Sequence, residues 1–281
     1  MAKIDKSKYT KAEWLAIREE RRNAKIEKSV NFKEYEQIRA KKIAENPGIY
    51  NYIVTLKVGN KYSSSYVNRL YEQCMKHLTI PVEFACLTED PSGLDKNIKV
   101  IPLELNDNIE GWWYKPFVFD KNFPLKGTLL FMDLDMIVFN NIDKLFTYKT
   151  GKFCVIRDFT RHQIPSWKKF NSSIVRMQTG QKHHVYDNFI ASPNTISRKY
   201  RGDQDWLFAQ VTDDFEFWPD EWIQSYKWEM RGNPKLVWKN DHKDFENTGD
   251  PQIKPQTSIA VFHGDPNPHC CLDPWVRKFW T

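Results

Sequence analysis

The feature that most constrains the fold is the run LLFMDLDMIVF at residues 129–139, in which only Asp133 and Asp135 interrupt nine apolar residues. The run lies where a central strand of a sheet would end. A buried carboxylate without a partner is costly, so such groups are paired, hydrogen-bonded or bound to a cation. The two aspartates therefore mark a candidate site at the end of this strand.

The segments before this run alternate between strand and helix patterns. Residues 52–56, 82–87 and 97–103 are predicted to be strands, and residues 65–78 carry apolar side chains at helical spacing between the first two. Strand, helix and strand in a chain of 281 residues predict an α/β fold with a mostly parallel central sheet. Two later strands are expected at residues 173–177 and 258–263, whereas residues 215–255 carry no clear pattern.

The N-terminal segment differs in composition from the rest of the chain. Residues 1–46 hold thirteen Lys and Arg against eight Asp and Glu, which accounts for most of the net charge of +6. This segment is rich in helix-forming residues and has no Gly or Pro before Pro47, so it is predicted to be a charged helical extension over residues 1–47. One domain is expected over residues 48–281. We expect a solvated or lightly docked helix. Peripheral contact with an anionic membrane or a partner is the second interpretation, and mixed charge disfavours nucleic acid.

The cysteines and the N-terminal residues indicate the cellular compartment of the protein. Five cysteines, with no CxxC pair, are interpreted as reduced thiols rather than as a disulfide framework or a zinc site. The first residues lack the apolar segment of a signal peptide, and no run reaches the length of a membrane span. These features predict a cytoplasmic protein, and they leave the oligomeric state open.

The DxD pattern fits two classes of enzyme. Side chains two apart on a strand share a face, and a divalent cation between two such carboxylates removes their repulsion. In phosphatases of the haloacid dehalogenase type, the first aspartate, here Asp133, is instead a nucleophile; that motif normally opens the domain, whereas several strand signals precede it here. In the plainest alternative, one aspartate caps the turn and the other is solvated.

Six segments in order resemble the nucleotide-sugar glycosyltransferases of the single-domain, Rossmann-like GT-A fold. The most similar family is the retaining one that includes glycogenin and bacterial lipopolysaccharide galactosyltransferases. The segments are VTLKVGNKY (54–62), WYKPFVFD (113–120), LLFMDLDMIVFNNIDKLF (129–146), FNSSIV (170–175), GDQDWLF (202–208) and FHGDPNPH (262–269). The resemblance implies metal-dependent transfer of a hexose, with retention, from a UDP-sugar to a hydroxyl acceptor such as a saccharide or glycolipid.

The resemblance also implies roles for individual residues. Asp133, Asp135 and His263 would hold Mn²⁺ or Mg²⁺, and an imidazole with the usual pKa near 6.5 would lose metal below that pH. Asp203 and Gln204 would position the sugar and stabilise charge, with no nucleophile assigned. The implied donor-binding residues are Thr55, Leu56, Tyr62, Lys115, Asp133, Leu134, Asp135, Asn171, Ser172, His263, Gly264 and Asn267.

One position departs from the family pattern. Asn267 stands where the family has a lysine on the diphosphate, and an amide cannot supply that charge. Either Lys115, Arg157 or Lys182 compensates, or turnover is slow. The departure also keeps a non-catalytic protein that binds nucleotide sugars among the alternatives.

Overall fold

The structure is a computed structural model that describes residues 37, 41, 50–239, 242–245 and 250–281. Almost all of the predicted N-terminal extension lies outside the described residues. The strands are β1 Asn51–Lys57, β2 Glu83–Thr88, β3 Lys99–Pro102, β4 Thr128–Met132, β5 Met136–Val138, β6 Cys154–Arg157, β7 Phe170–Gln178, β8 Glu216–Phe217, β9 Ile223–Ser225, β10 Leu236–Lys239, β11 His242–Phe245 and β12 Ile259–Val261. The α-helices are α2 Ser64–Lys76, α3 Asp143–Thr147, α4 His184–Ala191, α5 Pro193–Lys199, α6 Asp203–Gln210 and α7 Pro274–Phe279.

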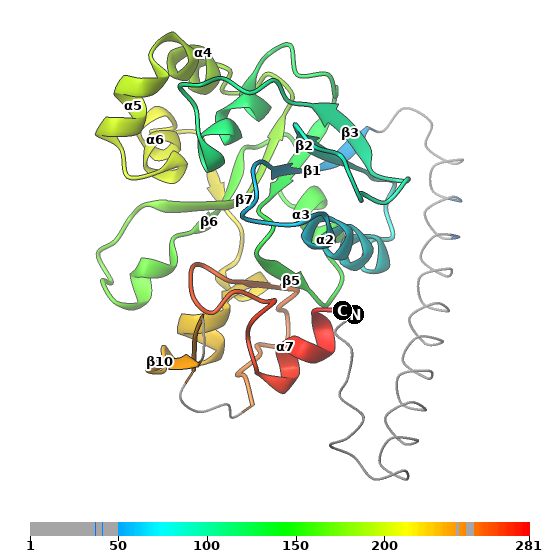
Figure 1. Cartoon of the computed structure of the whole chain (residues 1–281), viewed down its shortest axis with the longest axis vertical. Helices are drawn as coiled ribbons and strands as arrows, with labels where there is room; N and C mark the ends of the chain where they lie inside the picture. Colours follow the sequence, from blue (N-terminus) through cyan, green and yellow to red (C-terminus); the bar gives the residue numbers. More distant parts are fainter. Residues whose placement is uncertain (1–36, 38–40, 42–49, 240–241, 246–249) are drawn as a thin grey trace.

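A seven-stranded sheet in the order β3-β2-β1-β4-β7-β6-β8 forms the centre of the fold (Figure 1). Strands β3, β2, β1 and β4 run parallel to one another, and β6 pairs in parallel with β8. Strand β7 alone is antiparallel to its neighbours β4 and β6. The predicted α/β class with a mostly parallel central sheet is therefore confirmed.

Apolar side chains alternate between two cores, one on each face of this sheet. In β4, Leu130 and Met132 join one core, whereas Leu129 and Phe131 join the other. This alternation follows from the two-residue repeat of a strand, and both faces must be covered for such a run to be buried. Helices α2, α3 and α7 contribute to the first core; α4–α6 and the 3₁₀ helix η2, Gly111–Phe119, contribute to the second.

The apolar run at residues 129–139 forms two strands of different sheets. Strand β4 ends at Met132, the sequence Asp133-Leu134-Asp135 makes a bend, and β5 then enters a small sheet of order β5-β12-β9. In this bend Leu134 is buried in the first core, whereas the two aspartates keep partial exposure. The aspartates thus follow the end of a central strand, as the sequence predicted, but they lie in a bend where the chain changes sheets and not two apart on one strand.

The unassigned region at residues 215–255 contains short strands and turns. It includes β8 to β11, the 3₁₀ helix η4 Asp220–Trp222 and the single π-helical turn η5 Tyr226–Met230. Among the described residues, no helix is long and apolar enough to cross a membrane.

Candidate active site

One edge of the central sheet gathers the predicted polar residues. Strands β4 and β6 end at this edge, before Asp133 and Asp158 respectively, and the antiparallel β7 begins there with Asn171 and Ser172. The backbone N–H of Asp133 donates to the carbonyl of Ser173, which ties the bend to β7. Ligands of open α/β sheets bind at the carboxyl ends of the strands, so this edge is the place to expect a site.

A buried lysine lies between two carboxylates at this edge. The Nζ of Lys115 is 2.7 Å from Oδ2 of Asp203 and 3.0 Å from Oδ1 of Asp133. Burial disfavours the charge on Lys115, but the two aspartates outweigh that effect and raise its pKa. Burial raises the pKa of Asp133, and the ammonium of Lys115 partly offsets that rise. Lys115 therefore neutralises one of the two carboxylates and leaves the cluster negative.

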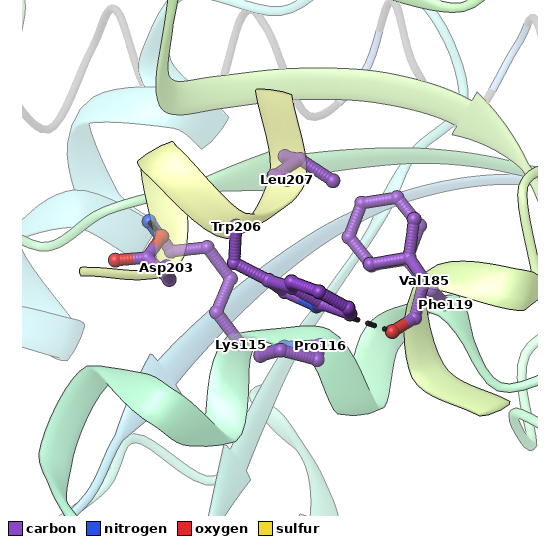
Figure 2. A pocket seen from close by; sticks show the side chains of 7 residues that line it. All are labelled: Lys115, Pro116, Phe119, Val185, Asp203, Trp206 and Leu207. Atoms are coloured by element: carbon purple, nitrogen blue, oxygen red, sulfur yellow. Dashed lines mark hydrogen bonds and ion pairs between the residues drawn. The ribbon is translucent and has the colours of Figure 1, made fainter. Parts of the chain in front are cut away.

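Figure 2 shows Lys115 reaching from η2 toward Asp203 at the first turn of α6. The indole of Trp206, also on α6, donates to the carbonyl of Val185 at 3.3 Å and lines the same small space as Lys115. The space enclosed by these side chains is too small to admit a water molecule. They form a packed floor that fixes the ammonium and the carboxylate in place.

A hydrogen-bonded network extends from Asp203 along the edge. The hydroxyl of Ser172 donates to Asp203 at 3.1 Å, and the backbone N–H of Ser172 donates to Oε1 of Gln204 at 3.1 Å. The Nε2 of Gln204 donates to Oδ2 of Asp158 at 2.6 Å. The other carboxylate oxygen of Asp158 accepts from the N–H of Thr160 at 2.7 Å. Both catalytic candidates are thus held by the amino end of β7 and the end of β6.

The second aspartate of the bend lies on the other side of the cluster. The hydroxyl of Tyr62 donates to Oδ2 of Asp135 at 3.2 Å. Burial, and then the negative charge of Asp133, raise the pKa of Asp135 to about 7. A nearby cation favours the ionised form of a carboxylate. Asp135 is therefore a carboxylate whose charge a bound metal ion would stabilise.

His263 follows strand β12, and its backbone segment is joined to the aspartate bend. The N–H of Phe262 donates to the carbonyl of Asp135 at 2.9 Å. The imidazole itself packs on Phe159, and its Nε2 is 2.5 Å from the Ser225 hydroxyl. Burial, and then the charge of Lys227, lower the pKa of His263 to about 4. The expectation that metal is lost below pH 6.5 stays a prediction, and the lower pKa of the buried ring moves the expected loss to a lower pH.

The donor set fits a divalent cation only in part. Asp133 and Asp135 supply the oxygen ligands that Mg²⁺ and Mn²⁺ prefer, and Asp135 lacks an ion-pairing cation of its own among the described residues. No group of three His, Cys, Asp or Glu side chains in the described part of the chain is arranged around a common metal position. The two aspartates fit the metal, whereas Nε2 of His263 is already hydrogen-bonded to the hydroxyl of Ser225.

The remaining predicted donor residues lie around this cluster in different environments. Thr55 is fully buried in β1, and its hydroxyl has no hydrogen-bond partner in the described structure. Leu56 packs against the second core. Gly264 adopts a φ of +81° and is exposed, and the carbonyl of Asn267 accepts from the N–H groups of Cys270 and Cys271. These contacts leave the ligand-binding roles of all four residues as predictions.

Asp158 belongs to the cluster but was missed in the sequence. The signal that could have found it is its place directly after β6, which begins with the apolar residues Cys154-Val-Ile and ends at Arg157, as Asp133 follows β4. An acidic residue at the end of a second strand of the same sheet is expected at the same edge. Without the pairing of β6 with β7, however, nothing in the sequence indicates that this strand lies near β4.

No protein-family model matches the sequence, and no curated protein matches it either. Solved structures do match. The apo form of the glycosyltransferase GlyE from Streptococcus pneumoniae TIGR4 aligns over 82% of this chain with a TM-score of 0.56 and 13% identity. This chain has the fold of a glycosyltransferase. It spans 59% of the length of GlyE.

The galactosyltransferase LgtC is a second structural neighbour. Its complex with donor and acceptor sugar analogues aligns over 81% of this chain and 93% of LgtC, with a TM-score of 0.55 and 13% identity. An active-site mutant of LgtC, in which a glutamine is replaced by a glutamate, aligns with a TM-score of 0.57. The resemblance drawn from the motifs is thus confirmed at the level of the fold.

Proposed function

We propose that this chain transfers a hexose from a UDP-sugar to a hydroxyl acceptor, with retention and with a divalent metal ion. The observation that carries the proposal is the group formed by Lys115, Asp133 and Asp203, with Asp135 beside it, at the ligand edge of a glycosyltransferase fold. Sugar transfer from a nucleotide needs a site that tolerates a negative leaving group and holds a neutral sugar. The half of the cluster with Asp133 and Asp135 supports the first property, and the half with Asp203 and Gln204 supports the second.

The half with Asp133 and Asp135 supports metal and diphosphate binding. These carboxylates would hold Mn²⁺ or Mg²⁺, and Tyr62, hydrogen-bonded to Asp135, would lie on the nucleotide side. A bound divalent ion stabilises the charge that builds on a leaving diphosphate. Asp133 is shared between Lys115 and the proposed metal, so the lysine orients a metal ligand.

The half with Asp203 and Gln204 supports sugar and acceptor binding. Asp203 is 13% exposed, and both of its fixed partners, Lys115 and Ser172, are buried. Gln204 is clamped by Ser172 and Asp158, so its amide has one orientation. These residues would position the sugar and stabilise charge as it develops on the sugar ring. In LgtC a glutamine is named as an active-site residue, which supports a role for Gln204.

The two alternatives receive less support. In phosphatases of the haloacid dehalogenase type the DxD motif normally opens the domain, whereas here Asp133 follows β4, after β1 to β3. A protein that binds nucleotide sugars without turnover remains the second candidate, because Asn267 stands where the resemblance implies a lysine. The network around Gln204 favours the transferase, since such fixed polar groups serve positioning in catalysis.

A panel of ligands tests the proposal. Thermal shifts of the full chain would be recorded with UDP-hexoses, other nucleotide sugars and sugar phosphates, each with Mn²⁺ and with EDTA. We expect UDP-hexoses to raise the melting temperature only with metal, and those that bind to be hydrolysed slowly to UDP and free sugar. Release of inorganic phosphate from sugar phosphates would support the phosphatase instead, and metal-independent binding without UDP release would support the binding protein.

A further inference from the structure

Lys227 is a half-buried lysine beside the loop that follows β12. It lies on the π-helical turn η5, directly after β9, and its Nζ donates to the carbonyl of His263 at 3.3 Å. Its Nζ lies 3.8 Å from the position that a Cβ would take at Gly264. The ammonium thus lies against the backbone of the His263-Gly264 segment.

The small sheet brings this ammonium to the same edge as the metal-binding bend. Strand β9 runs parallel to β12, so Lys227 and His263 both follow carboxyl ends on one side of the sheet. Strand β5 is antiparallel to β12, so Asp135, which precedes β5, lies at that same side. The N–H of Phe262 fixes this arrangement by donating to the carbonyl of Asp135.

The charge of Lys227 has no close counter-ion within the described structure. Asp265, exposed on the loop, is the carboxylate whose charge reaches it, and the two form no ion pair within 4.0 Å. Several other half-buried or buried lysines in the described part of the chain do have such partners, although Lys144 does not: Lys57 pairs with Asp90, Lys115 with Asp133 and Asp203, Lys169 with Asp205, and Lys239 with Asp244. A partly buried ammonium without a carboxylate is a place where an anionic ligand gains binding energy.

The loop beside Lys227 also leaves room for a ligand. Gly264 is exposed, and within 4 Å of its Cβ position the structure places only the Lys227 ammonium. A backbone without a side chain allows close approach of a ligand, and its φ of +81° favours glycine there. An anion at this place would meet the ammonium on one side and the exposed loop backbone on the other.

The three cations that the sequence offered in place of the family lysine are engaged elsewhere. Lys115 is held by two aspartates. Arg157 pairs with Asp220 at 3.4 Å, and Lys182 donates to the carbonyl of Asp213 and lies 3.9 Å from Asp214. The expectation that one of these three compensates for Asn267 therefore finds no support in their contacts.

We propose that the Lys227 ammonium binds the diphosphate of the nucleotide donor from the His263-Gly264 side. This inference rests on the proposed function, because the position of Lys227 beside Asp135 is what assigns a diphosphate to it. Asp133 and Asp135 reach the diphosphate only through a divalent cation, whereas Lys227 supplies a direct positive charge. Lys227 lies 36 residues before His263 in the chain, so it is outside the segment 262–269 in which the family has its lysine.

Calorimetric titration of the full chain tests the inference, with UDP, uridine and inorganic pyrophosphate as separate ligands and Mg²⁺ present. Lys227→Met removes the charge, and Lys227→Arg retains it. Lys144→Met is the matched control, because Lys144 is also half-buried without an ion pair among the described residues, and its ammonium contacts the Gln256 carbonyl and the Trp222 ring.

We expect Lys227→Met to bind UDP and pyrophosphate about tenfold more weakly, which corresponds to about 1.4 kcal/mol. Its affinity for uridine should be unchanged, and Lys227→Arg and Lys144→Met should bind UDP nearly as the wild type does. Equal UDP affinity of Lys227→Met and wild type would overturn the inference, as would an equal loss for uridine.

Two further results separate this inference from the proposed function. If the wild type binds pyrophosphate through Lys227 but not UDP, the diphosphate site stands and the nucleotide donor is wrong. If the wild type binds neither, both are wrong. Acetylation of wild-type lysines followed by peptide mass spectrometry requires no variant: UDP should protect Lys227 and leave Lys144 reactive, and equal labelling of Lys227 with and without UDP would also overturn the inference.

Discussion

Replacing Lys115 by methionine should destabilise the whole domain. Methionine keeps most of the length of the buried stem but removes the charge that lies 2.7 Å from Asp203 and 3.0 Å from Asp133. Removal of one partner of a buried ion pair costs about 3–5 kcal/mol. Because Asp133 remains 28% exposed and water can solvate it partly, we expect a loss of about 3 kcal/mol at pH 7.

The pH dependence of this loss has a defined sign. Burial raises the pKa of Asp133 above its unfolded-state value, and without the Lys115 ammonium this rise is no longer offset. The folded variant then binds more protons, so its stability relative to wild type recovers as the pH falls. Urea unfolding at pH 7 and pH 5 should therefore show a smaller difference between variant and wild type at the lower pH.

Two further variants serve as controls for Lys115→Met. Lys152→Met removes an exposed lysine that pairs with Asp214 at 3.2 Å, and it should cost less than about 0.5 kcal/mol. Asp203→Asn should lower the free energy of unfolding less in the Lys115→Met protein than in the wild type, and the two values should differ by about 2 kcal/mol. A Lys115→Met protein within about 0.5 kcal/mol of wild type at pH 7 would refute the buried ion-pair cluster.

Three other predictions follow from the same contacts. Burial lowers the pKa of His77 to about 4, so the unfolded state binds more protons between about pH 6.5 and pH 4. The free energy of unfolding of the wild type should therefore decrease as the pH falls from about 6.5 to 4, and His77→Gln should reduce this decrease by about 2 kcal/mol in urea unfolding. Asp158→Ala frees the amide of Gln204, so it should lower kcat about tenfold and leave UDP affinity unchanged by calorimetry; an equal loss of UDP affinity would contradict this role. A chain that begins at residue 47 should keep the UDP affinity of the full chain, because the site residues all lie beyond that point; an insoluble product would show that the domain boundary is wrong.

The fold was predictable from the sequence where local patterns determine the element. Strands β1 and β2 and helix α2 lie within two residues of their predicted ends, since their apolar periodicity is set by one strand or helix face. Residues 129–139 correctly predicted the end of a central strand, but an apolar run does not show that the chain then enters another sheet after Asp133-Leu134-Asp135. Sheet membership depends on pairing with β12, which lies more than 120 residues further along the chain.

The candidate site was predictable only in its motif residues. The DxD and DQD segments indicated Asp133, Asp135, Asp203 and Gln204, and their grouping is what the structure adds. Lys227 carried no signal, because its turn lies in the region at residues 215–255, where Trp, Pro and charged residues follow no period. A contact made by a side chain across two neighbouring strands cannot be inferred from spacing along one of them.

The state of His263 was likewise beyond the sequence. Its motif suggested a metal ligand, but the partners of its ring come from Phe159 and Ser225, on segments that the motif does not include. Their burial of the imidazole lowers its pKa to about 4. Whether the ring turns from Ser225 to a metal depends on a balance between a hydrogen bond and a metal–ligand bond that residue identity alone does not define.

In the proposed function, Asp135 and a divalent cation bind the nucleotide donor together. Calorimetric titration of UDP into the full chain, with Mn²⁺ and then with EDTA, measures this linkage directly in wild type and in Asp135→Asn. We expect Mn²⁺ to tighten UDP binding by about tenfold or more, about 1.4 kcal/mol, in wild type and to have no effect in Asp135→Asn. Equal UDP affinity of the wild type with Mn²⁺ and with EDTA would contradict the claim.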